Sequence, residues 1–590
     1  MSYVEQITTP VSVPKQAPTV PPNLRDYATF RADFSWDRLG RDLIDRNDDK
    51  FNIVHLALDR HAALTPDKVA VRFADQNHTV IEFTYKALWS RANRFSNWLR
   101  AHNLPRGAVV ASLLGRSPTL YSTLLGTLKY GAVFSPLFTA FGPEPIRSRM
   151  ELSGAAVLVT TQSLYERKVA PIRASLPALR HVLLVRDSSS AVLPPNTEDA
   201  EAALAAMHDT FATVPTQADE PALIHFTSGT TGKPKGVVHV HRAAIAHYAS
   251  AKLALDLHPE DVFWCTADPG WVTGISYGVI APLTCGVTSL VDREEMDIER
   301  WYDLLDKHRV TVWYTAPTAL RMLMKAGLDP LRKHSYPALR HIASVGEPLN
   351  PEAVLWGKEA FGLPVHDTWW QTETGAIMIA NFIAEPLYAG SMGQAMPGIE
   401  IAIGKRQEDG SVKILENGEV GEIVLRPGWP SMFKTYLNDE ARFRKSFADD
   451  WYFSSDEARR DERGYFWFVG RSDDIIKSSG HLISPFELES TLNQHSAVLQ
   501  SAVIGLPDEM AGQIVRAVIE LRPGQNASEE VRRSILAHAR RALGAAIAPR
   551  EIEFIDSLPR TRSGKIMRRL LRARALGQPE GDLSTLEPTA

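Results

Sequence analysis

The chain has 590 residues, with 65 Lys or Arg against 69 Asp or Glu, for a formal net charge of −4. Hydrophobic residues make up 44% of it, enough for a large core, which excludes a largely disordered chain. The balanced charge gives no reason to expect a nucleic acid or an anionic membrane as partner, and two cysteines, Cys265 and Cys285, are too few for a disulfide scaffold or a Cys-X-X-Cys metal site.

Residues 1–35 are rich in Pro, Thr and Val and are predicted to form an extended N-terminal arm. From residue 36 to 471, short β-branched runs such as 69–74 and 109–114 alternate with helical patterns such as 88–102. This alternation predicts an α/β domain of stacked mixed or parallel sheets with helices. The N-terminus has no basic stretch leading into an apolar core, and no long apolar run is free of Pro and Gly. We therefore expect a cytoplasmic protein without a membrane segment.

The pattern changes in the last third of the chain. From about residue 421 the predicted strands follow one another closely, which indicates a small antiparallel, β-barrel-like part of the large domain. Residues 472–590 then restart with a helix, strands at 501–507 and 515–524, a second helix and a third strand, which predicts a small α+β C-terminal domain. The basic segment 566–577 contains no aromatic residue, so a solvated helix face is favoured over a nucleic-acid patch.

The clearest local motif is TSGTTGKPKG at 227–236, directly after the apolar run 222–226. Its glycines allow backbone N–H groups to approach a polyphosphate, and its hydroxyls and lysines can bind the phosphate oxygens. The spacing from Gly229 to Gly232, with Pro234 after the first lysine, does not match the P-loop pattern GxxxxGK[ST]. The alternative is a flexible surface turn, which Gly and Ser also form.

Further motifs follow in order along the chain. They are ADPGWVTG (267–274), YTAPTALRML (314–323), SVGEPLNP (344–351), HDTWWQTETG (366–375), YFSSDEARRDERGYFWFVGRSDD (452–474), SSGHLISPFELES (478–490) and PRTRSGKIMRR (559–569). With them the sequence resembles the adenylate-forming acyl-CoA synthetases, and within that family the bacterial acetate–CoA ligases. The resemblance implies ATP-dependent ligation of acetate or another short-chain carboxylate to coenzyme A through an acyl-adenylate, with release of AMP and pyrophosphate. It also implies that the C-terminal domain, 472–590, is a mobile lid that turns about a hinge at Asp473.

The resemblance assigns roles to individual residues. Lys565 is expected to reach the substrate carboxylate and the α-phosphate, where an ammonium group offsets the repulsion between two anions. Thr372 and Glu373 are the other catalytic candidates, with Glu373 as a Mg²⁺ ligand, since a hard cation between phosphates prefers carboxylate oxygen. The nucleotide-binding candidates are Thr227, Ser228, Gly229, Thr230, Thr231, Gly232, Lys233, Lys235, Gly346, Glu347, Pro348, Asp367, Thr368, Trp369, Gln371, Asp456 and Arg471.

The resemblance also assigns the other two substrate sites. Trp370 is expected to close the acyl pocket to long chains, with Val272, Thr273 and Val345 as the remaining wall. Ser479, Gly480 and Arg540 are expected to bind coenzyme A, although Arg541 lies one position from Arg540. A structural Mg²⁺ is implied at Asn493, His495 and Val498, where His495 could equally be an ordinary histidine at a helix C-terminus. Acetylation of Lys565 by a lysine acetyltransferase, reversed by a deacetylase, would remove its charge.

Three positions depart from the family pattern. Ser455 stands where Gly usually precedes the ribose-binding Asp, and Leu482 and Ser484 replace an Arg and a Gly, so a charge-assisted phosphate contact is missing unless Lys477 or His481 supplies it. Three other functions stay open: a ligase for propionate or another small acid, an adenylation enzyme that delivers the acyl group to a carrier protein, and a non-enzymatic binding module. The last would require loss of the phosphate loop or Lys565, and both are present.

Overall fold

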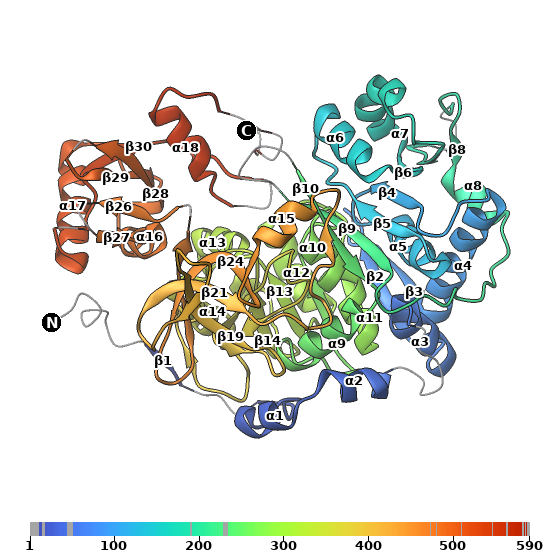
Figure 1. Cartoon of the computed structure of the whole chain (residues 1–590), viewed down its shortest axis with the longest axis horizontal. Coiled ribbons are helices and arrows are strands. Elements are labelled where there is room, and N and C mark those ends of the chain that lie inside the picture. The colour runs from blue at the N-terminus through green and yellow to red at the C-terminus, as the bar shows by residue number, and fades with distance from the viewer. Residues whose placement is uncertain are drawn as a thin grey trace.

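The computed structural model describes residues 11–14, 18–43, 51–188, 192–227, 234–472, 474–478, 481–508, 510–545, 547–561, 565–580, 583 and 586, and only the backbone of 481, 482 and 487. Two large sheets with helices form most of the molecule, and a smaller C-terminal part lies beside them (Figure 1). The predicted α/β class is confirmed.

The first large sheet has eight strands, of which six consecutive neighbours are parallel, while the other two are antiparallel at one edge. Most residues of its central strands are buried, because helices cover a parallel sheet on both faces. In order across the sheet the strands are β22 (Thr435–Tyr436), β10 (Lys235–Val240), β9 (Pro221–Thr227), β5 (Val133–Pro136), β4 (Val109–Leu113), β6 (Val157–Thr161), β7 (His181–Val185) and β8 (Glu198–Asp199).

The second large sheet has nine strands with a parallel centre and antiparallel edges. Its strands are β18 (Gln394–Ala395), β16 (Ile379–Ala380), β15 (Val365–Trp369), β14 (His341–Ser344), β13 (Val312–Thr315), β11 (Val262–Cys265), β12 (Thr288–Asp292), β2 (Val69–Ala74) and β3 (Val80–Thr84). One hydrophobic core contains residues of β2 from this sheet and of β4, β5 and β9 from the other. The two sheets are therefore packed into one body.

Helices complete that core and cover the outer faces. They are α3 (Arg60–Leu64), α4 (Tyr85–Ala101), α5 (Pro118–Tyr130), α6 (Pro143–Ser153), α7 (Gln162–Leu164), α8 (Ala200–Ala205), α9 (Ala243–Leu253), α10 (Val272–Ile275), α11 (Ala281–Cys285), α12 (Ile298–Lys307), α13 (Pro317–Ala326) and α14 (Pro351–Phe361). The buried α5 shows how the sequence sets helix ends: the Ser117 side chain accepts from the Leu120 N–H, Pro118 opens the helix, and Gly131 ends it at φ 81°.

A third, antiparallel sheet follows in the chain and contains the strands predicted after residue 421. It comprises β20 (Val412–Ile414), β19 (Ile401–Arg406), β21 (Val420–Leu425), β24 (Trp451–Arg460), β23 (Phe447–Ala448) and β25 (Phe466–Arg471), with α15 (Glu440–Lys445) in the connection. In this sheet Asp456 on β24 lies opposite Arg471 on β25.

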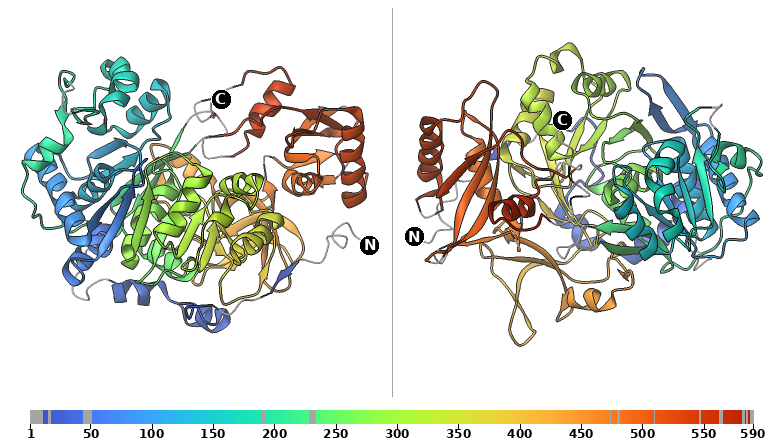
Figure 2. Two further views of the ribbon diagram at one scale, coloured as in Figure 1. Left: turned by 180° about the vertical axis from the view of Figure 1, so that it is seen from behind. Right: turned by 90° about the horizontal axis from the view of Figure 1, so that it is seen from above.

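The C-terminal part has its own three-stranded sheet and its own hydrophobic core. Its elements are β26 (Ile476–Ser478), β27 (His481–Ile483), α16 (Pro485–Asn493), β28 (Val498–Asp508), β29 (Gly512–Leu521), α17 (Glu529–Leu543), β30 (Glu551–Phe554) and α18 (Arg568–Ala575). The prediction that the basic segment is a solvated helix face is wrong in part, because α18 buries Leu570, Leu571 and Ala573 against β28. Two further views show α17 on the side turned away from the large sheets (Figure 2).

The sequence predicted an extended N-terminal arm, but the structure shows that part of the arm is helical. β1 (Ser12–Val13) pairs with β17 (Leu387–Tyr388), and α1 (Tyr27–Asp33) and α2 (Trp36–Leu43) follow. Asp26 caps α1 by accepting from the Thr29 N–H, and the buried Tyr27 donates its hydroxyl to the Ala395 carbonyl, so this part of the arm forms a helix that packs on the core. Both cysteines are free thiols. Among the described residues we find no helix with the length and apolarity needed to span a membrane.

Candidate active site

The carboxyl ends of parallel strands of the nine-stranded sheet form the base of the site, the position where open α/β sheets bind ligands. β14 leads into Val345, Gly346 and Glu347, and β15 leads into the loop 370–375. Gly346 has φ 96°, a conformation that favours glycine and turns the chain away at the end of the strand. These two segments carry the predicted nucleotide-binding residues Gly346, Glu347 and Gln371.

Asp456 is the centre of a buried polar cluster. Its Oδ2 accepts from Trp369 Nε1 at 3.1 Å and from Gln371 Nε2 at 2.6 Å, and its Oδ1 accepts from Arg471 Nη1 at 3.3 Å. The structure thus brings together four residues that the sequence predicted separately. The pKa of the Asp456 carboxyl is raised, because the effect of burial exceeds the opposing effects of the Arg471 charge and the two hydrogen-bond donors.

The loop after β15 is fixed through Gln371 and the backbone. Besides its bond to Asp456, Gln371 accepts at Oε1 from the Tyr452 hydroxyl at 3.1 Å. The carbonyl of Thr372 lies 2.7 Å from His239 Nε2, and that of Gly375 lies 2.9 Å from His247 Nε2. Burial lowers the pKa of both histidines to about 4, so each is neutral and donates from Nε2 to the carbonyl.

Sequence analysis missed these two histidines. His239 lies on β10 and His247 on α9, and no motif marks them as neighbours of residues more than 100 positions away. Asp367 and Thr368, by contrast, were predicted as walls of the nucleotide site, and the structure buries both. Thr368 donates to the Ser344 carbonyl at 2.7 Å, and burial raises the pKa of Asp367 well above its ordinary value.

Glu373 lies where the phosphate loop leaves the sheet. Its Oε1 accepts from the Tyr436 hydroxyl at 2.9 Å, and the Lys235 ammonium lies 5.6 Å from the centre of the Tyr436 ring. Lys235 pairs across the sheet with Thr227 at the base of the loop. The predicted loop residues Ser228, Gly229, Thr230, Thr231, Gly232 and Lys233 lie outside the described residues. The carboxylate of Glu373 is a donor that fits Mg²⁺.

The predicted acyl pocket is aromatic on one side. The Trp370 indole donates from Nε1 to the Tyr314 hydroxyl at 3.3 Å, and its ring packs edge-on against Tyr277 with centroids 5.1 Å apart. Tyr277 and Tyr314 have no exposed surface, so they cannot retreat from the indole. Val345 belongs to the same core.

The opposite candidates, Val272 and Thr273, open the short helix α10. Gly274 lets this helix pack against the preceding loop, because a Cβ there would lie 2.1 Å from the carbonyl oxygen of Asp268. That contact is part of the ADPGWVTG motif, and it explains the glycine in structural terms.

Lys565 lies on a turn of the C-terminal part that faces the large sheets. Its backbone N–H donates to Thr561 Oγ1 at 3.0 Å, and the Thr561 N–H donates to its carbonyl at 2.7 Å. The side chain is accessible to solvent but surrounded by protein, and this desolvation lowers the pKa of its ammonium group. The charges that act on it are those of Glu347, Arg471, Asp456 and Glu373.

Two residues of α13 hold the Glu347 carboxylate in place. It accepts from Thr318 Oγ1 at 2.6 Å and from the guanidinium of Arg321. Both belong to the YTAPTALRML motif, which the sequence showed without assigning them a role. Pro348 follows directly after Glu347 and is half-buried.

Of the predicted coenzyme A residues, only Arg540 lies within the described part of the chain. Arg540 lies in the last turn of α17, and this helix lies on the side of the C-terminal part turned away from the large sheets (Figure 2). Ser479, Gly480 and the hinge residue Asp473 lie outside the described residues. Of the departures, Ser455 has φ 61° and donates its N–H to Glu422 Oε1 at 2.5 Å, so a serine adopts the conformation that favours the family's glycine. Ser484 donates its hydroxyl to the Val469 carbonyl.

The predicted structural Mg²⁺ site lies where α16 ends and β28 begins. Asn493 Oδ1 accepts from Ser501 Oγ at 2.8 Å, and His495 Nε2 lies 2.9 Å from Ser534 Oγ. His495 Nδ1 accepts from the Ala497 N–H, and its carbonyl accepts from the Val498 N–H. The candidate ligand atoms already form hydrogen bonds within the protein, and two of them are histidine nitrogens, whereas Mg²⁺ prefers oxygen ligands. This metal site stays a prediction.

Comparisons with known proteins give consistent likenesses. A family model described as AMP-binding enzyme matches residues 58–437, and one described as AMP-binding enzyme C-terminal domain matches 487–565. The chain is 42% identical to an acetyl-coenzyme A synthetase of Bacillus subtilis over 96% of this chain and 98% of that one, and 38% identical to one of Methanothrix thermoacetophila over 91% and 85%. Among solved structures, a Brucella canis acyl-CoA synthetase has a TM-score of 0.74 at 34% identity, with 94% and 99% of the chains covered. An anthranilate CoA ligase bound to anthranoyl-AMP has a TM-score of 0.81 at 26% identity, with 90% and 98% covered.

Proposed function

The chain belongs to the AMP-binding enzyme family, and from that premise we propose that it is an AMP-forming acetate–CoA ligase. The observation that carries the proposal is that the charges of Asp456, Arg471 and Glu373 act on Lys565 of the C-terminal part. The packing of Trp370 against Tyr277 and Tyr314 supports the predicted small acyl pocket. A cation at that point serves a reaction between two anions, and a small pocket serves a small acid.

The reaction has two steps. In the first, a carboxylate oxygen of acetate attacks the α-phosphorus of ATP, and pyrophosphate leaves with the electron pair of the broken P–O bond. In the second, the sulfur of coenzyme A attacks the acyl carbon and AMP leaves. No covalent enzyme intermediate is required, so the protein acts by positioning and by placing positive charge.

The residues divide this work. Asp456 would accept from the ribose hydroxyls, held in place by Trp369, Gln371 and Arg471. Lys565 would bind the acetate carboxylate and the α-phosphate together, which stabilises the charge that develops at phosphorus. Glu373 would hold Mg²⁺, which when bound neutralises charge on the phosphates of ATP.

The pose of the lid favours the first step. Lys565 faces the nucleotide residues, while Arg540 belongs to α17, the helix turned away from the large sheets (Figure 2). Binding of coenzyme A by Arg540 would therefore require the C-terminal part to turn, a hinge closure of the kind that few contacts oppose. Acetylation of Lys565 would then block the first step and leave the second. This modification, its enzymes and the cytoplasmic location stay predictions.

The test is AMP release by the purified protein with ATP, Mg²⁺ and coenzyme A across acetate, propionate, butyrate and octanoate, together with ATP–pyrophosphate exchange without coenzyme A. Exchange and coenzyme A-dependent AMP release confined to the two shortest acids would support the proposal. Preference for octanoate would refute the pocket assignment. Exchange without coenzyme A-dependent turnover would refute the ligase and favour delivery to a carrier protein.

A further inference from the structure

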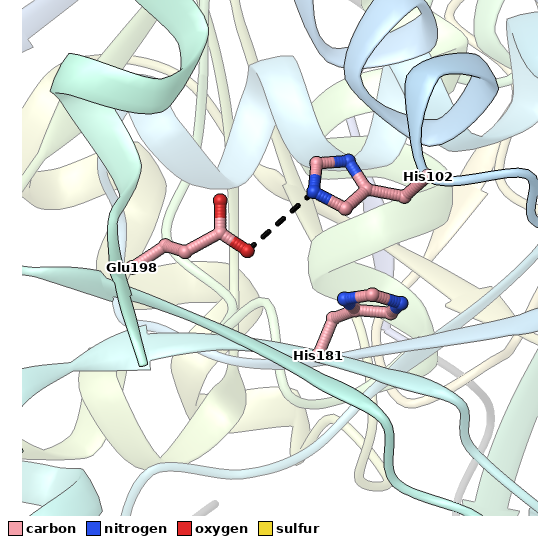
Figure 3. Close-up of side chains that lie close together, drawn as sticks. All are labelled: His102, His181 and Glu198. Atoms are coloured by element: carbon pink, nitrogen blue, oxygen red, sulfur yellow. Dashed lines mark ion pairs between the residues drawn. The ribbon is translucent and has the colours of Figure 1, made fainter. Parts of the chain in front are cut away.

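A group of three metal-ligand side chains lies far from the active site. His102 follows the end of α4, His181 begins β7 and Glu198 begins β8, so three separate segments contribute (Figure 3). One ligand atom from each lies within 4.8 Å of the others. β8 is the edge strand of the eight-stranded sheet opposite β22, so this group is remote from Lys235 and the nucleotide residues.

The separations suit a four-coordinate metal. His102 Nε2 lies 3.6 Å from Glu198 Oε1, and the rings of His102 and His181 are 5.0 Å apart between centroids. In a tetrahedral zinc site with bonds near 2.1 Å, neighbouring ligand atoms are about 3.4 Å apart. Small side-chain rotations therefore suffice to bring all three ligands to a metal.

Trp98 orients two of the proposed ligands, His102 and Glu198. His102 Nδ1 lies 2.9 Å from the Trp98 carbonyl, which assigns the proton to Nδ1 and leaves the Nε2 lone pair directed at Glu198. The Trp98 indole stacks on the His102 ring and donates from Nε1 to Glu198 Oε2 at 3.3 Å.

We propose that His102, His181 and Glu198 form a Zn²⁺ site that joins the edge strand β8 to the end of α4. Two imidazoles and one carboxylate are a typical zinc donor set with a fourth position left for water, whereas Mg²⁺ and Ca²⁺ prefer oxygen donors only. Each ligand comes from a different segment, so the ion stabilises the folded chain over the unfolded chain, in which the three are far apart.

The experiment measures Zn²⁺ binding to the tag-free, chelator-treated full chain by competition with a chromogenic chelator, together with the visible spectrum after Co²⁺ addition and the Tm with and without Zn²⁺. The variants are His181→Gln and Glu198→Gln, the second keeping an acceptor for Trp98. The control is His334→Gln, because His334 Nδ1 lies 3.6 Å from Asp306 Oδ2, an equal separation, but outside any group of three in the described chain.

We expect one Zn²⁺ per chain, a Co²⁺ spectrum of a four-coordinate site and a Tm that rises with Zn²⁺ concentration. His181→Gln and Glu198→Gln should each weaken Zn²⁺ binding by about 100-fold or more, which exceeds the effect of losing a residue that only hydrogen-bonds to a ligand. The His334 variant should bind as the natural chain does. The proposal would be overturned if the natural chain bound no stoichiometric Zn²⁺. It would also be overturned if His181→Gln and Glu198→Gln both had the same metal-free Tm as the natural chain and bound Zn²⁺ as tightly.

Discussion

Replacing Trp370 by Gly should move the acid preference of the enzyme toward longer chains. The indole is held between Tyr277 and Tyr314, both fully buried, so in the natural chain the pocket wall cannot shift to admit another methylene. Its removal opens space next to the acyl group. The Tyr314 hydroxyl keeps a partner in Thr368 Oγ1 at 2.9 Å, so no buried polar group is orphaned.

The size of the effect is the sum of two free-energy terms, a penalty that the substitution removes and a burial that it adds. A methylene forced into the packed pocket costs about 1–3 kcal/mol, and in the opened pocket its burial contributes about 0.8 kcal/mol. The preference for an acid longer by one methylene should therefore change by about 2–4 kcal/mol, a change in the ratio of kcat/KM of roughly 30-fold to several hundred-fold.

The assay is coenzyme A-dependent AMP release for acetate, propionate, butyrate and valerate, with kcat/KM compared between acids for each protein. Trp370→Phe is the matched control, because it loses the bond to Tyr314 but keeps an aromatic ring that fills most of the space of the indole. It should retain more of the preference for acetate than the Gly variant does. The reasoning is refuted if the Gly variant folds, shows activity and has the same ratio of butyrate to acetate as the natural chain.

Three further predictions concern charge. Lys565→Gln should reduce ATP–pyrophosphate exchange by about 10²–10³-fold, as loss of one electrostatic contact to the transition state does, and spare thioester formation from supplied acetyl-AMP; full exchange activity would contradict this. Asp456→Asn should raise KM for ATP by roughly tenfold or more through loss of charge-assisted bonds, with KM for acetate unchanged; an equal rise for both substrates would indicate general damage instead. Burial lowers the pKa of His239, His247 and His366 to about 4, so between pH 6.5 and 4 the unfolded chain binds more protons, and the free energy of unfolding should fall as pH drops, by roughly 1 kcal/mol per histidine at pH 5.5. Urea unfolding at pH 7 and pH 5.5 measures this, and equal midpoints would disprove it.

Local patterns predicted the elements that depend on near neighbours. β-branched runs at 69–74 and 109–114 are β2 and β4, because such runs bury on both faces of a parallel sheet whatever their partners are. The arm was misjudged at Tyr27, where an Asp26 cap and a buried phenol produce a helix that composition alone does not indicate. In α18, two leucines among arginines were enough to bury one face.

By itself the sequence determined the α/β class and the order of the motifs, because these depend on residue type and spacing along the chain. Its resemblance to the adenylate-forming family added Asp456 and Lys565 as predicted site residues. Only the tertiary structure decided which of them meet. The bonds from Trp369 and Gln371 to Asp456 join positions more than 80 residues apart, and the buried histidines under the 370–375 loop come from elements that no motif marks. The His102, His181 and Glu198 group was equally invisible in the sequence, because the packing of α4 against the sheet, rather than spacing along the chain, places the end of this helix beside β7 and β8.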